Sequence, residues 1–198
     1  ALTALGCEPL HLPRALDTRE SLDATLLEGL EHADAVVLTG GSSVGERDLT
    51  PDAIDGLGEP GVIVHGLRVK PGKPTVLAAI GAKPVIGLPG NPASSLMILE
   101  AIVSPVFVGL TGATPRLPLC YEAKAAVDFK GREGWTWYVP AALERDSAHG
   151  LVATPLPLRS SHTSLLARAH GYVVLGESGV RIAAGERVLV HPFSSGGR

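Results

Sequence analysis

The stretch AVVLTGGSSVGERD (Ala35–Asp48) predicts an apolar strand that runs directly into a glycine-rich turn. Further along the chain, PVIGLPGNPASS (Pro84–Ser95) repeats the arrangement. Glycine lets the backbone curl so that its N–H groups approach a ligand closely and hold an anion. If the two strands are neighbours, both turns lie at the carboxyl edge of an open α/β sheet, where ligands bind in such folds. The sequence therefore predicts one anion-binding crevice built from both turns.

Charged residues extend this crevice in two ways. Between the two turns, KPGKP (Lys70–Pro74) places two cations on a proline-stiffened turn, which favours a second anion site. The first turn instead carries Asp48, whose carboxylate repels a phosphate unless a divalent cation lies between them. Two interpretations of Asp48 stay open: a ligand of magnesium, or the cap of the following helix.

Two other polar residues also have both a structural and a functional interpretation. Asn91 either caps a helix that begins at Pro92 or contacts an anion at the helix N-terminus. Asp17 either caps a helix that follows it, with Glu20 completing a capping box, or reaches the crevice. Residue chemistry alone favours the cap for both.

The order of predicted elements divides the chain into two domains. The first, residues 1–112, alternates strands and helices, which indicates an α/β domain of three layers. After about Thr114 the chain shows short alternating runs separated by turn residues, so residues 113–198 predict a small all-β domain, a barrel or a sandwich. Expected strands cover 7–12, 34–39, 61–69, 75–80, 84–88, 119–129, 135–143, 151–156, 171–176 and 180–190; expected helices begin near Asp17, Thr50 and Pro92, the last kinked one turn before Pro105.

Composition excludes several classes of protein. The net charge of −3 gives no bulk electrostatic case for binding nucleic acid or an anionic membrane. The apolar run Leu96–Leu110 is interrupted, so we expect it to be too short to span a bilayer, and we expect no signal peptide. We therefore expect a cytoplasmic protein in which Cys7 and Cys120 are reduced thiols. Residues 1–6 resemble the end of a helix capped by Gly6, so we expect a fragment of a longer chain.

Three motifs together resemble the molybdopterin-binding family. They are Gly-Gly-x-Ser-x-Gly-x-x-Asp at residues 40–48, Lys-Pro-Gly-Lys-Pro at 70–74 and Leu-Pro-Gly-Asn-Pro-x-Ser at 88–94, in the family's order. The second domain is similar to the C-terminal domain of molybdopterin molybdenumtransferases. The resemblance thus covers nearly the whole chain, and it implies a three-layer molybdopterin-binding domain followed by a barrel-like β domain.

The resemblance implies a reaction and a set of site residues. The protein would insert molybdate into adenylylated molybdopterin with Mg²⁺, release AMP, and act as a homodimer. Asp17 and Asp48 match acidic positions at the family's active site, and Asp48 would also hold the metal. Substrate-binding positions would be Gly40, Gly41, Ser43, Gly45, Lys70, Lys73, Pro89, Gly90, Asn91, Ser94 and, from the β domain, Ser160.

The chain also departs from the family pattern. The family's first strand, which carries a Gly-Asp-Glu-Leu motif with an active-site glutamate, is not in this chain, nor are its N-terminal domains. Gly66 stands where a basic residue is common, while Arg132 matches an arginine of the β domain. Two alternatives therefore stay open. One is a related molybdopterin adenylyltransferase, which normally lacks residues 114–198; the other is a molybdopterin-binding module without insertion activity.

Overall fold

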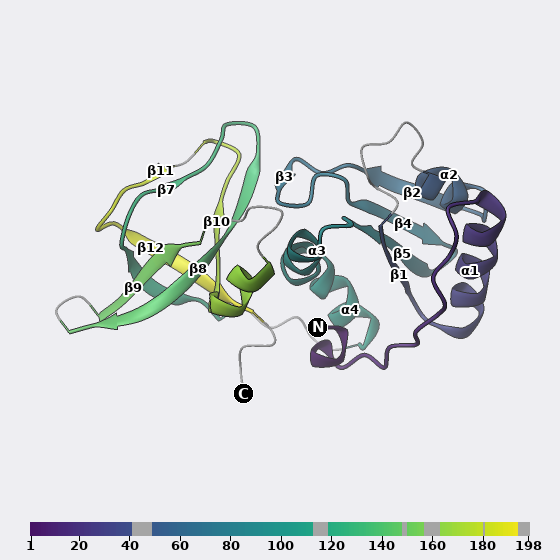
Figure 1. The fold of residues 1–198 in the computed structure, drawn as a ribbon, viewed down its shortest axis with the longest axis horizontal. Helices are drawn as coiled ribbons and strands as arrows, with labels where there is room; N and C mark the ends of the chain where they lie inside the picture. Colours follow the sequence, from purple (N-terminus) through teal and green to yellow (C-terminus); the bar gives the residue numbers. More distant parts are fainter. Residues whose placement is uncertain (41–48, 113–118, 148–149, 157–162, 180, 194–198) are drawn as a thin grey trace.

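The computed structural model describes residues 1–40, 49–112, 119–147, 150–156, 163–179 and 181–193. An α/β domain and a β domain lie side by side in Figure 1. The elements of the first are η1 (Leu2–Leu5), α1 (Arg19–His32), β1 (Val36–Thr39), α2 (Leu49–Asp55), β2 (Pro60–His65), β3 (Val69–Lys70), β4 (Val76–Ile80), β5 (Lys83–Leu88), α3 (Pro92–Ile98), η2 (Leu99–Val103) and α4 (Ser104–Leu110).

The central sheet of the first domain has the strand order β1-β5-β4-β2. β1 and β5 are parallel, while β4 is antiparallel to both β5 and β2. The strands expected over 34–39, 75–80 and 84–88 are confirmed. The strand expected over 61–69 is instead two, because the chain turns at Gly66, whose φ of +84° favours glycine. β3 leaves this sheet and pairs with a strand of the second domain.

The strand expected over residues 7–12 is wrong. Residues 8–15 form no backbone–backbone hydrogen bond with any other described residue. β1 ends the sheet, and its outer edge has no partner strand among the described residues. A strand needs a neighbour to satisfy its N–H and C=O groups, so an apolar pattern alone did not make one here. The C-cap expected at Gly6 is confirmed: this residue is left-handed and ends a single 3₁₀ turn.

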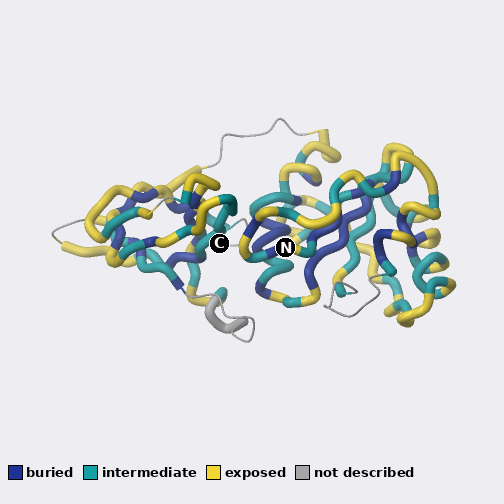
Figure 2. The backbone as a smooth tube through the Cα atoms, turned by 90° about the horizontal axis from the view of Figure 1, so that it is seen from above, coloured by how far each residue is buried: buried dark blue, intermediate teal, exposed yellow. Residues whose placement is uncertain are grey.

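Helices cover both faces of the sheet, which confirms the three layers. Alternate residues of a strand face opposite sides. Val85 therefore packs with α1 and α2 around Leu26 and Ile54, while its neighbour Ile86 packs with the helix that starts at α3, around Ile98. Buried residues concentrate on the central strands in Figure 2. Helix α2 begins at Leu49, so Thr50 and Pro51, expected as its cap and first residue, both lie inside its first turn.

The helix over Pro92–Leu110 loses its regular α-helical hydrogen bonding in the turn before Pro105, where the kink is expected. Between α3 and α4 lies η2, one turn with π-helical hydrogen bonding. Pro105 has no N–H to donate to the preceding turn, which accounts for the wider hydrogen-bonding pattern there. By length and apolar composition this helix could cross a membrane. The helix includes residues 92–95 in addition to the apolar run Leu96–Leu110, which by itself was expected to be too short. Its side chains Met97, Ile98 and Val103 are nevertheless fully buried.

The second domain is a closed barrel of five strands within the described residues. The strands follow the order β10 (Gly171–Leu175), β12 (Arg187–Pro192), β6 (Tyr121–Ala125), β9 (Gly150–Pro155) and β8 (Thr136–Asp146), and a further pairing of β10 with β8 closes the ring. Its core includes Phe129, Leu175 and Val190. The other elements of this domain are β7 (Phe129–Lys130), η3 (Thr163–Arg168) and β11 (Arg181–Ile182). The barrel-like expectation is confirmed; the boundary at 112/113 stays a prediction, because residues 113–118 lie outside the described chain.

Candidate functional site

The two glycine turns start at the same edge of the sheet. β1 and β5 are parallel neighbours, and their last residues, Thr39 and Leu88, are paired. Gly40 has a φ of +100°. A Cβ atom placed on Gly90 would lie 3.5 Å from the Cα of Gly40, so the two turns are in contact through their backbones. The structure thus brings together Gly40 and Gly90 of the predicted crevice. Gly40, Gly90 and Asn91 are called the glycine edge below.

A pocket opens beside the glycine edge. Its volume is about 330 Å³, at the lower end of the range for small-molecule sites. The lining is largely apolar, and Thr39 and Ser95 supply hydroxyl groups. The lining residues are Ala1, Thr39, Leu88, Gly90, Pro92, Ser95, Leu96 and Leu99.

Asn91 caps helix α3, as residue chemistry favoured. Its Oδ1 accepts hydrogen bonds from the backbone N–H of Ser94 at 3.1 Å and from the Ser94 hydroxyl at 3.3 Å. The Ser95 hydroxyl donates to the carbonyl oxygens of Pro89 and Asn91. These bonds fix the LPGNP turn in a single shape. A ligand-binding role for Pro89, Asn91 and Ser94 stays a prediction.

Asp17 is not the cap of helix α1, so that expectation is wrong. The cap is Thr18, whose hydroxyl oxygen accepts a hydrogen bond from the Ser21 N–H at 3.3 Å. Asp17 is exposed, with no ion pair among the described residues. The start of α1 and the end of β1 lie at the same end of the domain in Figure 1. Asp17 directly precedes the cap Thr18 at this end of the domain, and its role at the glycine turns stays a prediction.

The turn Lys70–Pro74, called the lysine turn below, reaches this edge from the other side. β4 is antiparallel to β5, and Val76 pairs with Gly87, so the segment just before β4 lies beside the end of β5. Gly72 has a φ of +113°, and a Cβ there would overlap the side chain of Ile98 on α3. The turn is closed by a hydrogen bond from the Leu67 N–H to the Lys73 carbonyl, at 2.8 Å.

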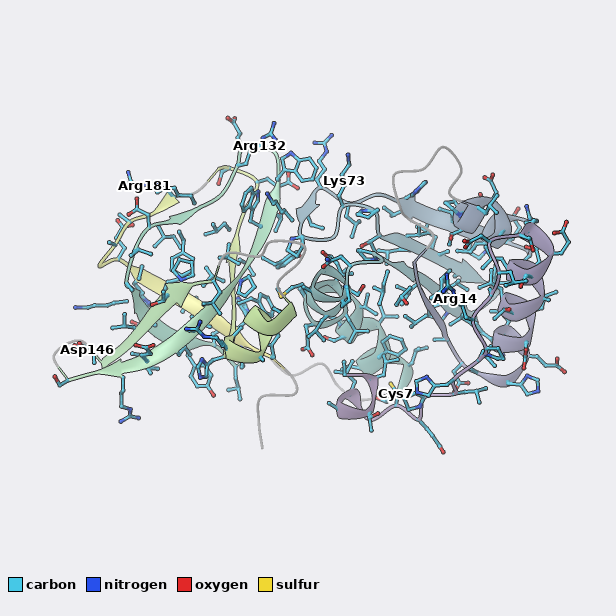
Figure 3. The ribbon with its side chains drawn as sticks, viewed as in Figure 1. Cys7, Arg14, Lys73, Arg132, Asp146 and Arg181 are labelled. Atoms are coloured by element: carbon cyan, nitrogen blue, oxygen red, sulfur yellow. The ribbon has the colours of Figure 1, made fainter. Side chains whose placement is uncertain are left out.

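The two lysines of this turn are exposed. Neither forms a salt bridge with a carboxylate in the described part of the chain. In Figure 3 Lys73 and Arg132 point outward on the same side of the molecule, near the place where the two domains meet. Cations without carboxylate partners are available to bind an anion.

The barrel contacts the first domain through aromatic side chains that the sequence did not mark as functional. Trp137, Tyr138 and Tyr172, with Lys70 and Glu100 opposite them, are called the domain junction below. The Nζ of Lys70 lies 4.4 Å from the centre of the Trp137 ring, a cation–π contact. Tyr138 packs against the core of the α/β domain. In the sequence, the one indication of the domain junction was Glu100, a charged residue in an otherwise apolar helix.

Burial raises the pKa of both tyrosines of the domain junction. Tyr138 and Tyr172 meet edge to face, with ring centres 5.9 Å apart. Burial raises the pKa of Tyr138. Burial, and next the negative charge of buried Glu100, raises the pKa of Tyr172 to about 12. Both phenols therefore stay neutral at physiological pH.

Several predicted residues lie outside the described chain: Gly41, Ser43, Gly45, Asp48 and Ser160. Within the described chain, no group of three or more His, Cys, Asp or Glu side chains is arranged to hold a metal ion. The magnesium site therefore stays a prediction, as do the roles of all the site residues.

Comparisons with known proteins agree for the two domains. Residues 1–108 match the family described as "Probable molybdopterin binding domain", and residues 122–193 match "MoeA C-terminal region (domain IV)". Among curated relatives, the chain is 31% identical to a molybdopterin molybdenumtransferase of Bacillus subtilis over 86% of this chain and 39% of the relative. It is 27% identical to one of Haemophilus influenzae over 98% and 48%. The chain thus spans less than half the length of these relatives.

Solved structures give the same result. A crystal structure of a molybdopterin biosynthesis MoeA protein from Pyrococcus horikoshii superimposes with a TM-score of 0.74 and 33% identity, over 90% of this chain and 42% of that one. A molybdenum cofactor biosynthesis protein from Pyrococcus furiosus has a TM-score of 0.77 at 19% identity, over 97% and 61%. The second comparison shows a shared fold.

Proposed function

The chain belongs to the family of probable molybdopterin-binding domains, and on that premise we propose that it works in molybdenum cofactor biosynthesis as part of a molybdopterin molybdenumtransferase. The proposed reaction inserts molybdate into adenylylated molybdopterin and releases AMP. The relatives that carry this name extend over 86% and 98% of the chain, which supports the proposal. The barrel argues against a molybdopterin adenylyltransferase, which normally lacks this domain.

One observation carries the proposal: three separate segments reach the same edge of the sheet. Gly40 and Gly90 contribute backbone at the ends of β1 and β5, and the lysine turn contributes charge at the start of β4. Backbone N–H groups at a glycine turn hold phosphate oxygens without a counter-charge. Lys70 and Lys73 would hold the second anion, molybdate, beside the pterin substrate. The residues of this edge thus bind and orient two anions that otherwise repel each other.

Magnesium fits the donor chemistry of this edge. Mg²⁺ is bound by one or two carboxylates together with substrate phosphates and water, and needs no cage of protein ligands. Asp17 is exposed and has no ion-pair partner among the described residues, and we propose that it and Asp48 supply the carboxylates. When bound, the ion would offset the negative charge of the substrate phosphates.

A homodimer and a cytoplasmic location complete the proposal. Both follow from the resemblance to the family. Sedimentation of the purified chain would test the dimer.

The test pairs ligand binding with turnover. Isothermal titration measures binding of adenylylated molybdopterin, and molybdenum incorporated per protein measures insertion. We expect Asp48→Ala to abolish magnesium-dependent insertion, while Asp34→Ala, an exposed carboxylate at the opposite end of β1, leaves it unchanged.

The outcomes separate the alternatives. Unchanged insertion by Asp48→Ala contradicts the proposed role of that residue. Binding by the natural chain without insertion favours a molybdopterin-binding module. Absence of molybdopterin binding overturns the proposed function.

A further inference from the structure

We propose that Trp137 of the barrel is a positioning residue for the Lys70 ammonium group, so that the second domain sets the geometry of the lysine turn. This inference rests on the proposed function for the use of the site, but the contact itself does not depend on it. Nothing in the sequence pattern assigns Trp137 a role beyond packing.

The contact comes from strand pairing across the two domains. β3 pairs in parallel with β8, and the register places Val69 beside Thr136 and Lys70 beside Trp137. The Thr136 N–H donates a hydrogen bond to the Arg68 carbonyl oxygen at 2.9 Å. The backbone of Arg68, Val69 and Lys70 is therefore bound to the barrel, whereas Gly66 and Leu67 before it donate to Thr75 and Lys73 of their own domain. This pairing puts the Lys70 Nζ 4.4 Å from the centre of the indole ring.

Trp137 is itself held firmly. On its other side β8 pairs with β10, where Trp137 lies beside Leu175. Its half-buried ring packs against the barrel core. The indole Nε1 is buried with no hydrogen-bond partner among the described residues, and an unsatisfied buried donor is costly. A phenylalanine would avoid that cost, whereas indole offers a better face to a cation. The ring face is thus the property that explains tryptophan at this position.

Lys70 gains most from such a platform because its side chain is long and flexible. A lysine that must meet an anion in one position loses rotamer freedom. Contact with an aromatic face restricts the ammonium before the anion arrives and leaves its outer N–H donors available. Lys73, on the same turn, has no aromatic contact among the described residues. Lys73 therefore serves as an internal control for Lys70: both lie on the same turn, but only the Lys70 ammonium group is held by an aromatic ring of the described residues.

The first experiment reads the contact directly. Reductive methylation with ¹³C-formaldehyde labels the five lysines of the chain and keeps their charge. We expect the Lys70 methyl signal, assigned by its loss in Lys70→Arg, to be shifted upfield by the indole ring current relative to Lys73. Trp137→Leu removes that shift, Trp137→Phe retains part of it, and Trp135→Phe leaves it unchanged. Equal positions for the Lys70 and Lys73 signals in the natural chain overturn the inference.

The second experiment asks what the contact does. Titration with molybdate, followed on the same signals and by calorimetry, should give an affinity that falls roughly tenfold in Trp137→Leu, less in Trp137→Phe, and not in Trp135→Phe. Circular dichroism checks that each variant is folded. Equal molybdate affinity in the natural chain and both Trp137 variants overturns the inference.

One outcome separates this inference from the proposed function. If the ring-current shift is present but molybdate does not bind, the positioning of Lys70 is supported and the anion site at the lysine turn is contradicted.

Discussion

The glycine edge and the domain junction are built in opposite ways. The glycine edge consists of backbone from short turns, each of which follows its own strand, with Asn91 fixing the start of α3. The domain junction consists of side chains from two domains, such as Lys70 on Trp137 and Glu100 near Tyr172. Turn chemistry is local and so is visible in a sequence, whereas a junction between domains depends on how two folded surfaces meet. The predictions below test this difference.

The largest effect is expected where the lysine turn sits on α3. Gly72→Ala combines an unfavourable positive φ with overlap of Ile98, so it should lower the free energy of unfolding by about 3 kcal/mol. Gly81→Ala is the matched control, because its φ is also positive but nothing lies within 4 Å; it should cost about 1 kcal/mol. Urea denaturation measures both. Equal costs would show that Ile98 does not support the turn.

At the glycine edge, Asn91 separates a structural from a binding role. Asn91→Ala should cost about 1 kcal/mol of stability through loss of the cap. Asn91→Asp keeps a capping oxygen, so its stability should change by less than about 0.5 kcal/mol, but its charge should weaken binding of an anionic pterin. Thermal unfolding and calorimetry provide the two measurements. If Asn91→Asp binds the ligand as well as the natural chain, Asn91 is a cap only.

The start of α1 offers a neighbouring pair of residues with different roles. Thr18→Ala should lower the free energy of unfolding by up to about 1 kcal/mol, because Thr18 caps the helix. Asp17→Ala should change it by less than about 0.5 kcal/mol, since the side chain is exposed and uncommitted. Denaturant titration of both variants measures their free energies of unfolding. A stability loss in Asp17→Ala equal to that in Thr18→Ala would show that Asp17 also stabilises the start of α1.

The smallest effect at neutral pH is expected from the junction. The pKa of Tyr172 is raised from 10.0 to about 12, first by burial. Between these pH values the unfolded chain loses the phenol proton while the folded chain keeps it, so stability falls as pH rises from 10 to 12. Tyr172→Phe should make the loss shallower, as measured by denaturation at several pH values. An identical pH dependence in that variant would contradict the raised pKa.

Some predictions made from the sequence were confirmed and others were wrong, and the difference has physical causes. The turn at Leu88–Pro92 was predicted together with its cap, because proline and asparagine dictate local geometry. The three layers followed from the alternation of strands and helices, and the short alternating runs predicted an all-β domain. The choice of a barrel over a sandwich came from the family resemblance. Residues 7–12 failed as a strand because strand formation needs a neighbour, and Asp17 failed as a cap because Thr18 stands one residue closer to the helix.

The sequence alone determined the turn at Leu88–Pro92, the lysine turn and the family, since these depend on residue type at short spacing. Only the tertiary structure decided which segments meet. It placed the start of β4 beside the end of β5, the Gly40 backbone against Gly90, and Trp137 beneath Lys70. Such contacts join residues far apart in the chain and depend on strand register and domain packing, which no local pattern encodes.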